Sequence, residues 1–254
     1  MADIAMTFAR TPLGALVLSP CVGSLLGVLI HRLPAGRPVA LTRSTCAGCG
    51  RTLSAVELVP LLSYLCFRGR CRCGVVAIGR FHLAVEVAAL AVPFSAALAG
   101  QTGAVLWAGC LLGWGLLVLA WIDAATFTLP DALTLPLVPA GLVATWWIAP
   151  TALARHAVAA VLGYAAFALL RLTWRAWRGI EGIGAGDAKL LAVGGAWAGL
   201  AALPNIVLGA GLAGLVLVGT LRLTGRDVGP ATRLPFGPPL AVAIWAAWLL
   251  LPHG

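Results

Sequence analysis

The chain has 254 residues, of which 61% are apolar and 10% are charged, and its mean hydropathy is +1.00. A soluble domain is about 45–50% apolar and about 25% charged, so this chain has too few polar residues to cover a water-soluble globule. The composition excludes a soluble enzyme, a disordered chain and a collagen-like repeat, and it predicts a membrane protein that crosses the bilayer several times.

Long apolar runs predict an all-α polytopic membrane protein with about eight transmembrane helices. A spanning helix needs about 20 mostly apolar residues, and the runs are continuously apolar, unlike the alternating strands of a membrane β-barrel. In chain order, the predicted spans are 11–31, 83–99, 104–122, 132–149, 152–170, 187–203, 205–221 and 236–252.

The basic residues predict the orientation of these helices. The chain has 17 basic and 8 acidic residues, a formal net charge of +9. Fourteen of the bases fall in three loops between predicted spans: Arg32, Arg37, Arg43, Arg51, Arg68, Arg70, Arg72 and Arg80 in the first, Arg171, Arg175 and Arg178 in the second, and Arg222, Arg226 and Arg233 in the third. Cytoplasmic loops are enriched in Lys and Arg, so we expect these loops in the cytoplasm and both termini outside. This pattern accounts for the positive charge without a nucleic-acid partner.

The first basic loop, 32–80, has room for a small cysteine-containing cytoplasmic domain. It holds the pair Cys46 and Cys49, spaced Cys-x-x-Cys, and the closer pair Cys71 and Cys73. Four thiolates from two such knuckles can surround a tetrahedral zinc ion, which would be structural because no coordination position stays open. Cys66 could replace one ligand, and free thiols or a redox pair are the alternatives.

Four of the eight acidic residues fall near the ends of predicted spans. Glu86 and Asp131 lie near span starts, where a helix N-terminus favours negative charge, while Asp123 and Asp187 lie on the same membrane face. Asp123 ends the third span and Asp187 opens the sixth, after Gly184 and Gly186. Carboxylates at such positions are costly and are candidates for function. Two close carboxyls share one proton, so the ionised member can act as a general base while the protonated one polarises a carbonyl. The alternatives are that Asp187 is a helix N-cap or that each aspartate pairs with an arginine.

Several ordered motifs resemble those of the prepilin peptidases, the type IV leader peptidases that are membrane aspartic proteases. The motifs, quoted in chain order, are Gly23-Ser24 with Arg32-Leu33-Pro34, Cys46-Ala-Gly-Cys49, the segment from Glu57 to Leu65, Arg68-Gly69-Arg70-Cys71, Glu86, Asp123 with Leu129-Pro130-Asp131, Gly184-Ala185-Gly186-Asp187-Ala188-Lys189, Gly194-Gly195-Ala196-Trp197, and Leu234-Pro235-Phe236-Gly237-Pro238. They span nearly the whole chain. Such an ordered set is much more specific than any single motif.

The resemblance implies a catalytic pair and a set of supporting residues. Asp123 and Asp187 correspond to the catalytic aspartates. The residues expected to contact substrate or to support the pair are Gly184, Gly186, Lys189, Asp131 and Glu86, with Asp131 a helix cap or a partner of the pair. The implied substrates are type IV prepilins and the pseudopilins of type II secretion, cut after a glycine at the cytoplasmic face of the bacterial inner membrane.

The resemblance also implies a second activity, methylation of the new amino terminus with S-adenosylmethionine, associated with the cysteine-bearing domain and the Glu86 region. The expected organisation is a first helix over 1–31, a cysteine domain over 32–82 and a peptidase domain over 83–254. One departure bears on this: the second cysteine pair of the family is usually Cys-x-x-Cys, but here it is Cys71-Arg-Cys73. Zinc binding and methylation therefore depend on a shortened motif, while the aspartate motifs are intact.

The sequence is also compatible with four other functions. The chain could be a protease-only member with a degenerate methyltransferase domain, a transporter with ion-binding carboxylates, a catalytically inactive scaffold, or a redox protein. A transporter predicts acidic residues deep in the spans and inverted repeats, neither of which the sequence has. A redox protein predicts thiols near the oxidising side, and the cysteine loop falls on the opposite, basic side.

Overall fold

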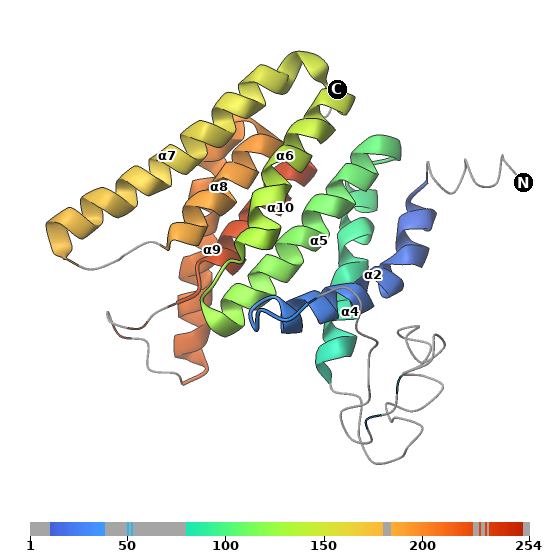
Figure 1. The fold of residues 1–254 in the computed structure, drawn as a ribbon, viewed down its shortest axis with the longest axis horizontal. Coiled ribbons are helices and arrows are strands. Elements are labelled where there is room, and N and C mark those ends of the chain that lie inside the picture. Colours follow the sequence, from blue (N-terminus) through green and yellow to red (C-terminus); the bar gives the residue numbers. More distant parts are fainter. Residues whose placement is uncertain are drawn as a thin grey trace, which may run out of the picture. The chain divides into compact units, whose positions relative to one another are not determined.

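The computed structural model describes residues 11–38, 50, 52, 80–179, 184–225, 229, 232 and 234–250. The secondary-structure elements in this part of the chain that position the site are all helical (Figure 1). The α-helices are α2 (Pro12–Arg32), α4 (Arg80–Leu98), α5 (Gly103–Thr126), α6 (Asp131–Ile148), α7 (Leu153–Arg178), α8 (Ala185–Ala198), α9 (Leu203–Leu223) and α10 (Gly237–Leu250), with short 3₁₀ segments η2 (Pro150–Ala152) and η3 (Leu200–Ala202). The chain divides into two compact units, Met1–Trp114 and Gly115–Gly254, and the division falls within α5.

Each of the eight predicted spans corresponds to one of these α-helices, and the prediction of an all-α membrane protein is confirmed. Among the described residues, six helical segments are long and apolar enough to cross a bilayer. Helices α8 and α10 have only 14 residues each, which gives a helix length of about 21 Å at 1.5 Å per residue. The hydrocarbon core of a bilayer is about 30 Å thick. Eight crossings therefore stay a prediction.

Three helix ends differ from the sequence prediction by at least four residues. Helix α5 continues to Thr126, so Asp123 lies inside the helix, one turn before its end. Helix α7 runs to Arg178 and ends at Gly179, which adopts a left-handed conformation. The predicted span 187–203 is interrupted, because Gly199 takes a φ of +76° that ends α8 and starts the η3 turn.

In the first unit, small residues let α2 and α4 pack closely. Ala15, Ser19, Gly23 and Gly27 recur every fourth residue along α2, and all four are buried. A Cβ atom on Gly23 would lie 2.8 Å from the Cα atom of Glu86 on α4, so only glycine permits this approach. Small residues at a four-residue spacing are typical of close helix packing in membranes, where burial from water does not drive association.

In the second unit, α8 is the buried central helix, packed by α6, α7, α9 and α10. Nearly all of its residues from Asp187 to Ala198 are buried. Glycines again allow the closest contacts: Gly163 of α7 packs on the Leu191 carbonyl of α8, and Gly195 of α8 packs on the Ala159 carbonyl of α7. Because protein rather than lipid surrounds α8, this helix does not need the length of a spanning helix, and its short length is consistent with its position.

The predicted zinc ligands Cys46, Cys49, Cys71 and Cys73, and the alternative ligand Cys66, lie outside the residues that the structure describes. The other two cysteines are in helices: Cys110 is buried and Cys21 is exposed on α2. No cluster of metal-binding side chains occurs among the described residues.

Candidate active site

Asp123 lies near the end of α5 and is held by the start of α10. Its side chain is 6% exposed, and Oδ2 accepts a hydrogen bond from the backbone N–H of Gly237 at 2.8 Å. A Cβ atom on residue 237 would lie 2.6 Å from that oxygen. Glycine at this position therefore lets the backbone donate directly to a buried carboxylate.

Asp187 is the third residue of α8 and is 7% exposed. The N–H of Gly184, which is the helix N-cap, donates to Asp187 Oδ2 at 3.0 Å, and the N–H of Asp187 donates to the Gly184 carbonyl at 3.2 Å. The alternative that Asp187 is itself the N-cap is wrong, because Gly184 occupies that position. Its negative charge nevertheless lies in the first turn, where the helix dipole stabilises it.

The two carboxyl groups are close enough for the charge of Asp123 to act on Asp187. The hydrogen bonds to both side chains end on Oδ2, and within the described part of the chain Oδ1 of each accepts no hydrogen bond. Each carboxyl is thus fixed through one oxygen and keeps the other available. Two neighbouring carboxyls with a free oxygen each can bind a water molecule and share a proton.

Gly186, the second glycine before Asp187, faces the segment between α5 and α6. A Cβ atom on Gly186 would lie 2.8 Å from the Cβ atom of Leu129. The two glycines of the Gly-x-Gly motif therefore have separate roles. The first donates its N–H to the carboxylate, and the second has no side chain, so the segment that contains Leu129 can pack against it.

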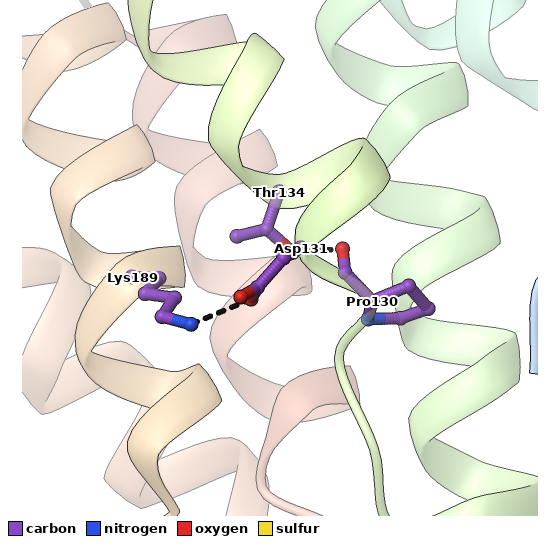
Figure 2. Close-up of polar contacts among 4 residues, drawn as sticks. All are labelled: Pro130, Asp131, Thr134 and Lys189. Carbon is purple, nitrogen blue, oxygen red and sulfur yellow. Dashed lines mark hydrogen bonds and ion pairs between the residues drawn. The ribbon is translucent and has the colours of Figure 1, made fainter.

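An ion pair joins α6 to α8 beside the carboxylates (Figure 2). Lys189 Nζ lies 2.5 Å from Asp131 Oδ1, and these side chains are 25% and 57% exposed. Asp131 is the first residue of α6, after the N-cap Pro130, whose carbonyl accepts a hydrogen bond from the Thr134 hydroxyl. Asp131 is therefore not the capping residue; it is a partner of Lys189, two residues along α8 from Asp187. An exposed pair contributes at most about 1 kcal/mol, so its effect is to orient these two helix ends.

Most of the arginines described in the second unit lie at the same end of that unit as the two aspartates. The aspartates lie at the C-terminal end of α5 and the N-terminal end of α8, and Asp123 contacts the N-terminus of α10. Arg175 and Arg178 lie in the last turn of α7, which runs antiparallel to the next helix, α8. Arg222 lies in the last turn of α9. Arg155, at the start of α7, lies at the other end.

The structure brings most of the predicted site residues together in the second unit: Asp123, Asp187, Gly184, Gly186, Asp131 and Lys189. Glu86 belongs to the first unit, where it is buried against Gly23. Gly237 and Leu129 contact the site residues, although the sequence alone predicts no role for either. Both lie in quoted motifs, and the placement of Gly237 directly before a proline at a helix start was the available signal.

These features define a polytopic helical membrane protein with a buried carboxylate pair, the arrangement that aspartic peptidases use. Two family models match the chain: the bacterial peptidase A24 N-terminal domain over residues 17–99 and the type IV leader peptidase family over residues 110–219. The second region contains Asp123, Asp187 and the Asp131–Lys189 pair.

Curated relatives match over most of the chain. A protein of Burkholderia pseudomallei strain 1026b is 41% identical over 92% of this chain and 85% of its own length. Proteins of Pseudomonas aeruginosa PAO1 and Aeromonas hydrophila are each 36% identical, over 92% of this chain and 88% of their own length. All three are named prepilin leader peptidase/N-methyltransferase. This chain belongs to the type IV leader peptidase family. No solved structure matched it.

Proposed function

We propose that this protein removes the leader peptides of type IV prepilins and type II secretion pseudopilins, cutting after a glycine, with Asp123 and Asp187 as the catalytic pair. One observation carries the proposal. Two buried carboxyls from different helices interact electrostatically, and each has one oxygen held by a glycine N–H and the other unpartnered within the described chain. The names of the relatives supply the substrate class.

The carboxyl pair supplies both acid and base for peptide hydrolysis. The ionised carboxylate takes a proton from a water molecule while the water oxygen bonds to the scissile carbonyl carbon. The protonated carboxyl gives its proton to the carbonyl oxygen, which forms a neutral tetrahedral diol. The C–N bond then breaks as the amine nitrogen takes a proton from the first carboxyl and a diol hydroxyl returns one to the second. These transfers yield an acid and an amine and restore one shared proton.

The proposed location is the bacterial inner membrane, with the aspartates at the cytoplasmic face. The basic ends of α7 and α9 lie at the same end of the second unit as the aspartates, and positive residues favour the cytoplasmic side. The pair would then meet the leader of a pilin whose apolar helix lies in the bilayer.

The second proposed activity is methylation of the new amino terminus, with S-adenosylmethionine supplying the methyl group. The proposed organisation remains a first helix over 1–31, a cysteine domain over 32–82 linked to methylation together with Glu86, and a peptidase domain over 83–254.

We assign Cys46, Cys49, Cys71 and Cys73 to a structural zinc ion, on the chemistry of four thiolates in two knuckles. We expect about one zinc per chain from elemental analysis of purified protein, and a Cys46→Ser variant to lose it. Zinc-free protein that still methylates would contradict the assignment.

Intact-mass analysis of a synthetic prepilin tests both activities. We expect purified protein to remove the leader, and to add the mass of one methyl group only when S-adenosylmethionine is present. Loss of the leader alone would identify a protease-only protein and contradict the methylation proposal. An uncut substrate, with a related enzyme active on the same sample, would contradict the peptidase proposal.

A further inference from the structure

A large cavity opens in the second unit at the end of α8 that is remote from the aspartates. Its volume is about 1050 Å³, and it lies where α6, η2 and α7 meet the last residues of α8 and α10. Asp187 lies in the first turn of α8 and Trp197 in the last, so most of the length of that helix separates the cavity from the proposed catalytic pair. Ligand pockets are usually about 300–1,000 Å³, so this cavity is large enough for more than a small polar headgroup.

The cavity has apolar walls and a polar rim. Ile148, Val158, Trp197 and Trp248 contribute apolar surface, and the two indoles pack edge to face. Arg155 and His156 contribute polar atoms. The segment Ala149–Ala152 joins two spans here, which places the rim at the level of the lipid headgroups. An amphipathic ligand matches this cavity, with its polar group at the rim and its apolar part against the walls.

His156 is oriented so that it presents a hydrogen-bond acceptor to the cavity. Nδ1 lies 3.0 Å from the Ala196 carbonyl oxygen and 3.2 Å from the Thr145 hydroxyl. A carbonyl can only accept, so Nδ1 carries the proton and Nε2 of the neutral ring keeps its lone pair. Gly199 packs against the Nε2 edge of the ring, where a Cβ atom would lie 2.9 Å from Nε2, and both residues line the cavity. Nε2 can therefore accept a hydrogen bond from a bound ligand.

Arg155 supplies a positive charge that has no counter-charge in the described part of the chain. It lies in the first turn of α7, which contains no acidic residue, and its side chain makes no ion pair or hydrogen bond with any described residue. A cation is unfavourable at the positive end of a helix dipole. An anionic group bound at the rim would relieve this repulsion, and its charge complements that of Arg155.

We propose that this cavity binds a membrane phospholipid whose headgroup donates a hydrogen bond, either phosphoethanolamine or phosphoglycerol. The phosphate pairs with Arg155, the headgroup N–H or O–H donates to His156 Nε2, and an acyl chain packs against Trp197, Trp248 and Ile148. Phosphocholine has the phosphate but no donor, so it satisfies only part of this site.

Native mass spectrometry of delipidated protein tests the site, using three lipids with identical acyl chains and phosphoethanolamine, phosphoglycerol or phosphocholine headgroups. We expect at least one of the donor headgroups to give fivefold or higher occupancy than phosphocholine. Comparison of the two donor lipids identifies which headgroup the site prefers. Equal occupancy by all three lipids would overturn the assignment of the headgroup contacts.

Two variants act on different parts of the proposed site. Arg155→Gln removes the phosphate partner and Ala201→Trp fills the cavity that Ala201 lines; we expect each to reduce occupancy at least fivefold, and Arg155→Lys to retain it. Ala165→Trp, on the exposed surface of α7 outside the cavity, is the matched control and should bind as the wild type does. Circular dichroism and gel filtration verify that each variant is folded. Unchanged occupancy in folded Arg155→Gln and Ala201→Trp would contradict the proposal.

Discussion

Gly237 and Gly184 each place a backbone N–H against a carboxyl of the proposed catalytic pair. The distances from N to Oδ2 are 2.8 Å for Gly237 to Asp123 and 3.0 Å for Gly184 to Asp187. Buried carboxylates are expensive unless hydrogen-bonded, and a backbone donor fixes them without a mobile side chain. The Asp131–Lys189 pair adds an ionic link between the helix ends around them. The positions of the two carboxyls therefore depend on backbone geometry at two helix starts.

We predict that Gly237→Ala lowers kcat for leader cleavage about 100-fold, the cost of displacing a catalytic group by about 1 Å. The reason is that the new Cβ would lie 2.6 Å from Asp123 Oδ2, so the carboxyl must move. Steady-state cleavage of a synthetic prepilin measures this. Gly211→Ala is the matched control, because a Cβ there meets open space, and it should cleave normally. Wild-type kcat in Gly237→Ala would show that the Asp123 position is not critical.

At the scale of the helices, the sequence was sufficient to predict where eight α-helices lie, because each is a continuous apolar run. It was not sufficient to predict the exact ends. Helix α5 passes Asp123 and continues to Thr126, since no glycine or proline stops it there. The end of α8 depends on the positive φ of Gly199, and the chain holds 31 glycines, most of which do not end helices.

Part of the candidate site could also be predicted from the sequence pattern. Asp123 and Asp187 are conspicuous because a carboxylate is rare in an apolar chain, and their motifs identify the family. The partnership of Gly237 with Asp123 joins residues 114 positions apart, and helix periodicity carries no information about such a tertiary contact. The same holds for the packing of Gly186 on Leu129.

Close packing of α7 on α8 should be needed for the stability of the second unit. We predict that Gly195→Ala destabilises the protein by about 1–3 kcal/mol, the usual cost of overpacking, because a Cβ there collides with the Ala159 backbone of α7. Thermal unfolding in detergent should show a lower Tm. Gly214→Ala, where a Cβ meets nothing, is the control and should keep the Tm or raise it slightly. An unchanged Tm in Gly195→Ala would show that the close packing of α7 on α8 does not contribute to the stability of the protein.

For the molecule as a whole, the proposed topology rests on the arginines in the last turns of α7 and α9, which lie at the same end of the second unit as the two aspartates. We predict that a cysteine at Thr151, in the connection between α6 and α7, reacts with a membrane-impermeant maleimide in intact spheroplasts. A cysteine at Thr224, after α9, should react only after lysis. Both positions are exposed, and the wild-type chain controls for its native cysteines. The reverse labelling pattern would place the aspartates on the outer face and contradict the proposed location.

The central claim is that Asp123 and Asp187 act together as the catalytic pair. The most direct test is the intact mass of a synthetic prepilin after incubation with wild-type, Asp123→Asn and Asp187→Asn proteins of equal helical content. Each asparagine variant keeps the shape of the side chain but cannot ionise. We predict full removal of the leader by the wild type and none by either variant. Wild-type cleavage by either single variant would contradict the claim that the pair performs the hydrolysis.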